Sequence, residues 1–354
     1  MWIEIKDDIF ESVDDGNLTY LLKILFDMPK GSQNHRADLL VNIGNIIDSP
    51  IFQGLSSTDQ GLIEDSVKLF SYEENITVKY KVSNAEKECY NLEEATAFFQ
   101  EPLWIVVENS MNDSNFVKAI IHHFDDSKKF LIDCLNNRWV QFANAGGSAA
   151  KHEINNKLTA FDSLAARYSS KNEKYFKGFV IMDGDRDYPQ QDVKDEYIKL
   201  CEFLDFKNIK WHILEKRAME NYMPDETIAD IKNIKSTSTR HDDRKCIEWI
   251  NVYQLLSNDQ KNHLKFQSSK RYEDLELPAQ TLYLNQLPTN YSILHEGINY
   301  RDNESNGIDE DERRFKNSFP KLFLFSPHVN KMSLQNRCGN NELQNIYNSI
   351  KSLV

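Results

Sequence analysis

Length, composition and charge exclude several classes of protein. The chain has 354 residues, of which 40% are hydrophobic, and a formal net charge of −13. This charge argues against a protein that coats nucleic acid by bulk electrostatics, because such binding needs clustered Lys and Arg. A small basic patch on an acidic body is still compatible with it. The length exceeds that of a usual single core and predicts one main domain with additions at both ends.

The cysteines and the apolar runs bear on the cellular compartment. The five cysteines are scattered, without a CxxC pair or a zinc-type spacing, which fits a reducing compartment. The chain does not begin with a basic and apolar leader, and none of its apolar runs reaches the ~18 residues of a membrane span. We therefore expect a cytoplasmic protein without membrane contact. It also lacks the GxxxxGK[ST] motif, so any ATPase would be another subunit.

Residues 1–100 are predicted to form a helical N-terminal region that could bind a partner. Residues 18–26 and 37–47 carry apolar residues at helical spacing. The alternation of ITVKYKV, residues 76–82, favours a short strand instead.

Residues 101–230 have the clearest rhythm of apolar runs and amphipathic stretches. The predicted strands are residues 103–109, 138–147, 176–185 and 209–217. The predicted helices between them are residues 114–124, 149–169 and 192–206. Strands that alternate with helices indicate βαβ units. The fold class is therefore α/β, with a Rossmann-like parallel sheet of about four strands and helices on both faces.

Residues 231–354 are predicted to be a mainly helical C-terminal region. Its segment 301–314, RDNESNGIDEDERR, reads as a charged loop, and residues 341–354 as an amphipathic final helix.

Acidic residues follow two of the predicted strands. Glu108 ends the first strand, and Asp183, Gly184 and Asp185 end the third. In an extended segment Asp183 and Asp185 lie on one face, and ligands of open parallel sheets bind at the carboxyl ends of the strands. Clustered carboxylates are neutralised by hard cations such as Mg²⁺ or Mn²⁺. The alternative is an ordinary strand-to-helix turn with an aspartate cap.

The motif VVEN with Glu108, followed by MDGD with Asp183 and Asp185, resembles the TOPRIM domain. This domain is shared by topoisomerases, bacterial primases, recombination proteins and OLD-family nucleases, and the resemblance covers about residues 101–224. Many members have a glycine after the glutamate and another acid a few residues on. Here Asn109 replaces that glycine, and Asp113 is one or two residues late, which puts its role as a metal ligand in doubt.

The segment LEKRAMENYMP, residues 214–224, is similar to the Glu-Asn-Tyr segment of OLD-like nucleases and of TOPRIM proteins in phage-defence systems. The resemblance makes Glu215, Lys216 and Glu220 further site candidates. The alternatives are a solvated strand end for Lys216 and a helix-dipole partner for Glu220. Gly146 and Gly147 would let the backbone approach a substrate phosphate, or simply end a strand.

The resemblance implies a metal-dependent nuclease that acts on DNA or RNA, tRNA included. The metal ion, Mg²⁺ or Mn²⁺, would be held by Glu108, Asp113, Asp183, Asp185 and Glu220. Glu108 would also orient water, and Lys216 would offset charge on the phosphate.

By the same resemblance the chain would be the toxic effector of a bacterial antiviral system, restrained by a sensor, inhibitor or ATPase partner. A homodimer is one open alternative for its oligomeric state. Two other functions stay open, namely a catalytically silent TOPRIM-like binding subunit and a phosphohydrolase of small molecules.

Overall fold

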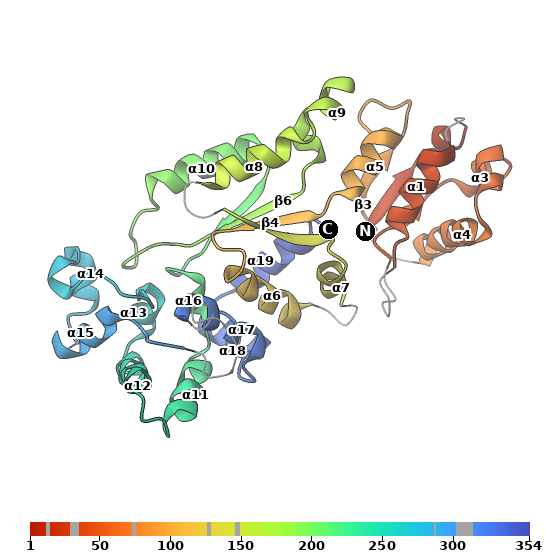
Figure 1. Ribbon diagram of the computed structural model, residues 1–354. Coiled ribbons are helices and arrows are strands. Elements are labelled where there is room, and N and C mark those ends of the chain that lie inside the picture. Colours follow the sequence, from red (N-terminus) through yellow and green to blue (C-terminus); the bar gives the residue numbers. More distant parts are fainter. Residues whose placement is uncertain are drawn as a thin grey trace.

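Two separate parallel sheets organise the chain, and helices pack beside each of them (Figure 1). The computed structural model describes residues 1–11, 15–28, 35–72, 76–125, 129–145, 149–286, 288–301 and 314–354. The fold is α/β, as predicted, but with a second sheet that the sequence did not lead us to expect. Within the described ranges, no helix combines the length and apolar character that a membrane span requires.

The larger sheet has four strands in the order β5-β4-β6-β7, each parallel to its neighbours. Its strands are β4 (Leu103–Val107), β5 (Val140–Asn144), β6 (Gly178–Met182) and β7 (Lys210–Ile213). All of β6 is buried, and so is all of β4 except Trp104, as expected for the inner strands of a parallel sheet. The predicted four-stranded sheet is confirmed.

Helices cover both faces of this sheet (Figure 1). They are α6 (Asp113–Phe124) and α7 (Phe130–Asn136) on one face, and α8 (Ala150–Thr159), α9 (Asp162–Arg167) and α10 (Asp195–Phe206) on the other. Successive residues of β4 point to opposite faces: Ile105 packs in one buried cluster with Phe116, and Val106 in another with Ile154. The single helix predicted over residues 149–169 is two helices, because the chain turns near Phe161 and buries that ring.

The N-terminal region is not simply helical, which corrects the prediction. It holds a three-stranded parallel sheet in the order β2-β1-β3, made of β1 (Trp2–Ile5), β2 (Asp38–Leu40) and β3 (Val78–Val82). The helix predicted over residues 37–47 is wrong at its start, because Leu39 pairs with Ile3 in the sheet. The short strand expected within residues 76–82 is confirmed by β3.

The helical elements of this region surround a core of its own. They are η1 (Asp7–Phe10), α1 (Asp15–Leu25), α2 (Ile43–Ile46), α3 (Pro50–Gly54), α4 (Ser57–Tyr72) and α5 (Leu92–Gln100). Every buried residue of this core lies between Ile3 and Phe99. The contacts with the part of the chain that carries the larger sheet include the ion pair of Glu94 with Lys174 and the Tyr90 ring, which packs against both cores.

The C-terminal region is mainly helical in its described part, as predicted. Its elements are η4 (Met219–Tyr222), α11 (Asp225–Lys235), α12 (His241–Tyr253), α13 (Asn258–His263), η5 (Tyr272–Asp274), α14 (Leu277–Leu282), α15 (Pro288–Glu296), α16 (Phe315–Ser318), α17 (Leu322–Phe325), α18 (Lys331–Cys338) and α19 (Glu342–Lys351). It shares a core with α6, since the Phe116 ring packs against the rings of Tyr222 and Phe323, with distances of 5.1 Å and 5.2 Å between the ring centroids. Residues 302–313 of the predicted charged loop lie outside the described residues.

Candidate functional site

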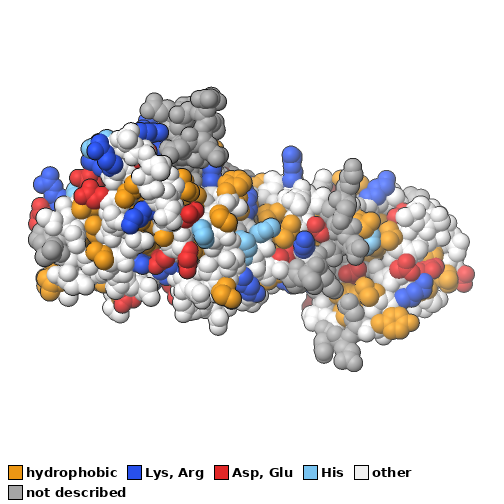
Figure 2. Space-filling model, turned by 90° about the horizontal axis from the view of Figure 1, so that it is seen from below, with side chains coloured by type: hydrophobic (Ala, Val, Ile, Leu, Met, Phe, Trp, Pro, Cys, Tyr) orange, Lys and Arg blue, Asp and Glu red, His pale blue; other side chains and the backbone are white. Residues whose placement is uncertain are grey.

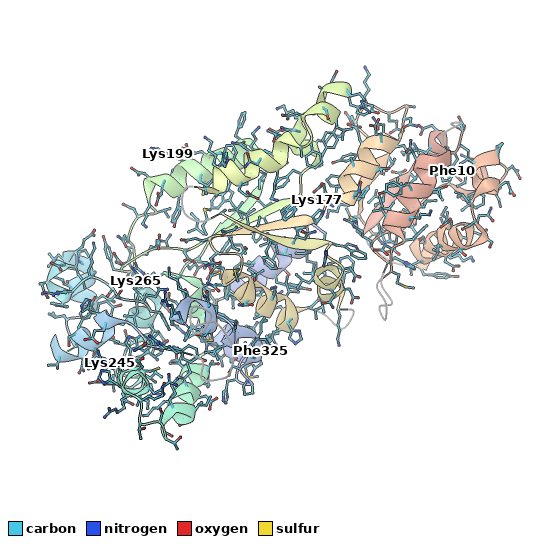
Figure 3. All side chains as sticks on the ribbon, in the orientation of Figure 1. Phe10, Lys177, Lys199, Lys245, Lys265 and Phe325 are labelled. Atoms are coloured by element: carbon cyan, nitrogen blue, oxygen red, sulfur yellow. The ribbon has the colours of Figure 1, made fainter. Side chains whose placement is uncertain are left out.

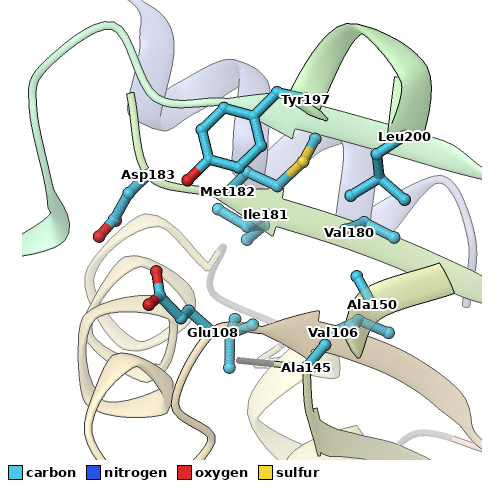
Figure 4. A pocket seen from close by; sticks show the side chains of 11 residues that line it. Val106, Glu108, Ala145, Ala150, Val180, Ile181, Met182, Asp183, Tyr197 and Leu200 are labelled. Atoms are coloured by element: carbon cyan, nitrogen blue, oxygen red, sulfur yellow. The ribbon is translucent and has the colours of Figure 1, made fainter. Parts of the chain in front are cut away.

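The carboxyl ends of β4 and β6 bring Glu108 and Asp183 together. The two strands are hydrogen-bonded parallel neighbours, so the residues that follow them meet at one edge of the sheet. Figure 4 shows the two carboxylates pointing into the same space, in front of apolar side chains that include Val106 and Val180. This is the convergence that the strand ends predicted.

A cleft of about 490 Å³ lies at this edge. Asp113, the first residue of α6, and Glu220 of η4 also line it, as does Asp185. Five of the six acidic residues singled out from the sequence therefore share one cleft. Glu215 is the exception, because its carboxylate accepts a hydrogen bond from Asn340 in the C-terminal region.

Burial and mutual repulsion raise the pKa values of four of these acids. The pKa of Asp113 rises to about 7, chiefly because the group is buried. The negative charges of Glu220 and Glu108 raise it further, whereas a 2.7 Å hydrogen bond that the Asn109 N–H donates to Asp113 lowers it. The pKa of Asp183 lies well above its ordinary range, because the group is buried and faces Glu220, Asp113 and Glu108. Burial also raises the pKa values of Glu108 and Glu220. The cleft is therefore short of positive charge.

One oxygen of this set has no partner. Oδ1 of Asp183 is buried and receives no hydrogen bond within the described residues. Buried polar atoms are almost always paired, so an orphan among raised-pKa carboxylates fits a missing cation. The donor set is all carboxylate oxygen, which suits Mg²⁺ or Mn²⁺.

The cleft is not arranged as a finished metal site. Among the described side chains, no group of three or more His, Cys, Asp or Glu is placed to hold a metal ion. The chemistry of the donors fits a hard cation, whereas their present positions would have to adjust to bind one.

Asp185 has a different environment from Asp183. Its backbone is left-handed, with φ of 51°, so the extended geometry that would have put both aspartates on one face is broken. Burial opposes ionisation of Asp185, but hydrogen bonds from Lys194 at 2.6 Å and Tyr197 at 2.9 Å outweigh it and lower its pKa. Asp185 is thus already neutralised by a side chain just before α10.

Gly184 lets the end of β6 pass close to the chain that follows β7. A Cβ at this position would lie 2.5 Å from the carbonyl oxygen of Leu214 and closer still to that of Lys216. The next residue is fixed by a 2.8 Å hydrogen bond from the Asp185 N–H to the Arg217 carbonyl. Only glycine fits this turn without a backbone shift.

Lys216 does not line the cleft. Its ammonium group donates to Asn262, and the side chain is buried. Burial and the charge of Arg337 lower its pKa to about 8. The structure thus separates Lys216 from the carboxylates. Gly146 and Gly147 lie outside the described residues.

The structure adds cationic and aromatic residues that the sequence did not reveal. The cleft is also lined, beside the carboxylates, by Lys194, Arg217, Lys265, Lys316 and Phe315. Lys194 lies in the first turn of the helix predicted over residues 192–206, close to Asp183 and Asp185, and could have been suspected. The residues of the C-terminal region carry no motif, and only the folded chain brings them to the sheet edge.

Comparisons with known proteins found no match to the chain. No protein-family model, no curated protein and no solved structure matches it. The TOPRIM resemblance therefore stays a prediction that rests on the acidic residues at the two strand ends.

Proposed function

We propose that the chain is a divalent-metal-dependent nuclease of TOPRIM type. The observation that carries this proposal is the buried, unpartnered Oδ1 of Asp183, which faces Glu108 at the carboxyl edge of a parallel sheet. A carboxylate in that state is costly unless a proton or a cation compensates it. Phosphodiester hydrolysis is the chemistry that such a cation would serve.

Mg²⁺ or Mn²⁺ would be held by Glu108, Asp113, Asp183 and Glu220. Asp185 would become a further ligand once its ion pair with Lys194 is broken. When bound, the metal would act as a Lewis acid toward the scissile phosphate. The chain itself would supply proton transfer and positioning. With a pKa of about 7 in the absence of a metal, Asp113 would release its proton near neutral pH on becoming a ligand, while the Asn109 N–H holds its Oδ2 in place.

The biological setting remains a proposal from the resemblance alone. The chain would be the toxic effector of a bacterial antiviral system, acting on DNA or RNA, including tRNA. A sensor, inhibitor or ATPase partner would restrain it, and its oligomeric state, homodimer included, is open. The N-terminal unit, with a core of its own, is the candidate platform for that partner.

One observation favours a second candidate, a catalytically silent binding subunit. Asp185 is paired with Lys194, and the described acids are not arranged around a common point. In such a subunit Lys194 would replace the metal permanently.

Cleavage assays separate these candidates. Wild-type protein, Glu108→Gln, Asp183→Asn and a control, Glu248→Gln at an exposed position of α12, would be incubated with plasmid, single-stranded oligonucleotides, total tRNA and an aryl phosphate. Each substrate would be tested with Mg²⁺, Mn²⁺ or EDTA. We expect metal-dependent cleavage of nucleic acid by wild type and the control, and a loss of at least about 100-fold in both site variants.

Other outcomes reject the nuclease proposal. Turnover of the aryl phosphate alone would identify a phosphohydrolase of small molecules. No turnover of any substrate, with unchanged folding, would favour the silent subunit.

A further inference from the structure

Part of the wall of the cleft comes from the C-terminal region. Leu264–Gln267 follow α13, and Phe315 and Lys316 begin α16. Figure 3 shows Lys265 beside the C-terminal helices. The cleft therefore combines acids that lie at or near the strand ends with cationic and aromatic residues from segments far away in sequence.

We infer that the strand bound in this cleft is an unpaired nucleic-acid strand, with one base stacked on Phe315 and its phosphates against Lys265 and Lys316. This inference rests on the proposed function and names the class of its substrate. Three observations carry it: the support of the Phe315 ring, the state of the two lysines, and the size of the cleft.

Phe315 is packed on one side by other rings and is only half-buried. Its ring stacks on Phe319 at 4.8 Å with an angle of 28° between the planes, and Phe266 packs behind both rings. Its remaining surface lines the cleft. A ring fixed on one side and open on the other is a stacking platform, and any base can use it because every base has a π-face.

Lys265 and Lys316 are the cleft cations without a carboxylate partner. Arg217 is paired with Asp187 and Lys194 with Asp185, whereas neither Lys265 nor Lys316 forms an ion pair within the described residues. Both are exposed. The charge of Lys316 opposes the raised pKa values of Glu108 and Glu220, so its ammonium group acts at the carboxylate side of the cleft. A phosphate group bound by Lys316 would therefore lie near the acids.

The size of the cleft selects a single strand. Its volume of about 490 Å³ lies within the range of pockets for single small ligands, roughly 300–1,000 Å³. That space suits about one nucleotide and is too small to enclose a base pair together with both of its backbones. A base in a duplex would have to unstack before it could reach Phe315. The bulk charge of −13 leaves little attraction to a duplex backbone elsewhere.

Fluorescence anisotropy in EDTA tests the inference without any cleavage. Short labelled single strands of DNA and RNA, and the corresponding duplexes, would be titrated with wild type, Phe315→Trp, Phe315→Leu and the double variant Lys265→Ala/Lys316→Ala. Phe315→Leu keeps most of the apolar packing but has no ring. Phe325→Ala, at a ring that is 76% exposed on α17, is the matched control.

We expect single strands to bind at least about tenfold more tightly than duplexes. Phe315→Leu should weaken single-strand binding by roughly 10-fold, Phe315→Trp and the control should retain it, and the double lysine variant should bind with a shallower salt dependence. The DNA and RNA arms identify which strand is the natural ligand. Circular dichroism melts check that the variants stay folded.

Equal affinity for strands and duplexes, no binding of either, or unchanged binding by Phe315→Leu would each overturn the inference. Its failure is distinguishable from failure of the nuclease proposal. If strand binding depends on Phe315 but no metal-dependent cleavage occurs, only the nuclease proposal is rejected. If cleavage occurs but strand binding does not depend on Phe315, only the stacking site is rejected.

Discussion

Asp113 shows how an uncompensated acid affects both chemistry and stability. Its pKa is about 7 in the folded protein, against an ordinary value of 3.8, so the folded protein binds the proton more tightly than the unfolded chain does. The free energy of unfolding therefore falls as the pH rises from about 4 to about 7 and stays low above that range. Acid sites of this kind trade stability for function.

Asp113→Asn should consequently stabilise the metal-free protein. The amide keeps an oxygen that accepts the Asn109 N–H bond, and it cannot ionise. We expect the free energy of unfolding to rise by about 1–2 kcal/mol at pH 8 and by less at pH 5. This is less than the pKa shift alone would give, because the group is partly exposed and solvent screens its charge. Urea unfolding in EDTA at both pH values measures it, with Asp192→Asn at an exposed position as control. A gain that does not grow with pH would contradict the raised pKa.

Acidic positions of the cleft were the part of the site most open to prediction. Glu108 and Asp183 follow buried strands, and neighbouring parallel strands must end at a common edge. Lys216 follows a strand as well, yet its side chain turns to Asn262, which the sequence alone does not show. Phe315 and Lys316 reach the cleft only through packing of the C-terminal helices.

Among the elements, the junction between β6 and β7 is the tightest part of the site. Its close approach depends on Gly184, which lies against the carbonyl groups of Leu214 and Lys216. The turn also sets the position of Asp183 at the end of β6 and of Asp185 after it. Packing at this junction therefore determines where the acids lie.

Gly184→Ala should force the two chain segments apart. We expect a loss of about 1–3 kcal/mol in unfolding free energy, typical of overpacking, together with a loss of any metal-dependent activity. Gly61→Ala is the matched control, because a Cβ there meets nothing within 4 Å and the residue lies inside α4. That control should be neutral or slightly stabilising, by up to ~1 kcal/mol. Equal effects of the two substitutions would show that the junction is not constrained.

Strand prediction succeeded where apolar runs were long and failed where strands were short. The strands β4 and β6 have five residues each, all of them buried except Trp104, and their apolar runs have no competing helical pattern. In contrast, β2 has three residues, and they sit inside an apolar spacing that also suits a helix. Pairing of β2 with β1 decides its structure, and this tertiary contact has no local signal.

The two predicted domain boundaries, near residues 100 and 230, differ in whether a core crosses them. The N-terminal core is complete between Ile3 and Phe99. The core beneath the larger sheet instead combines Phe116 and Phe179 with Trp249, Phe319 and other residues of the C-terminal region. The predicted domain 101–230 thus shares its core with residues 231–354.

Fragments of the chain test this division. We expect residues 1–100 and residues 101–354 each to unfold cooperatively in thermal melts followed by circular dichroism, since each keeps its buried cluster whole. Residues 101–230 should lack a cooperative transition, because the fragment would lack the apolar side chains of the C-terminal region that pack around α6. A cooperative, monomeric melt of residues 101–230 would show that the C-terminal region is a separate domain.

Binding of Mn²⁺ to the intact chain, followed by electron paramagnetic resonance, tests most directly whether the carboxylates at the sheet edge form a cation site. We predict that wild type and the Glu248→Gln control bind Mn²⁺ with the same affinity, and that Asp183→Asn weakens binding about tenfold or more. Mg²⁺ should compete for the same site. Equal Mn²⁺ binding by wild type and Asp183→Asn, or no binding by any of them, would contradict the assignment of the buried Asp183 oxygen to a metal.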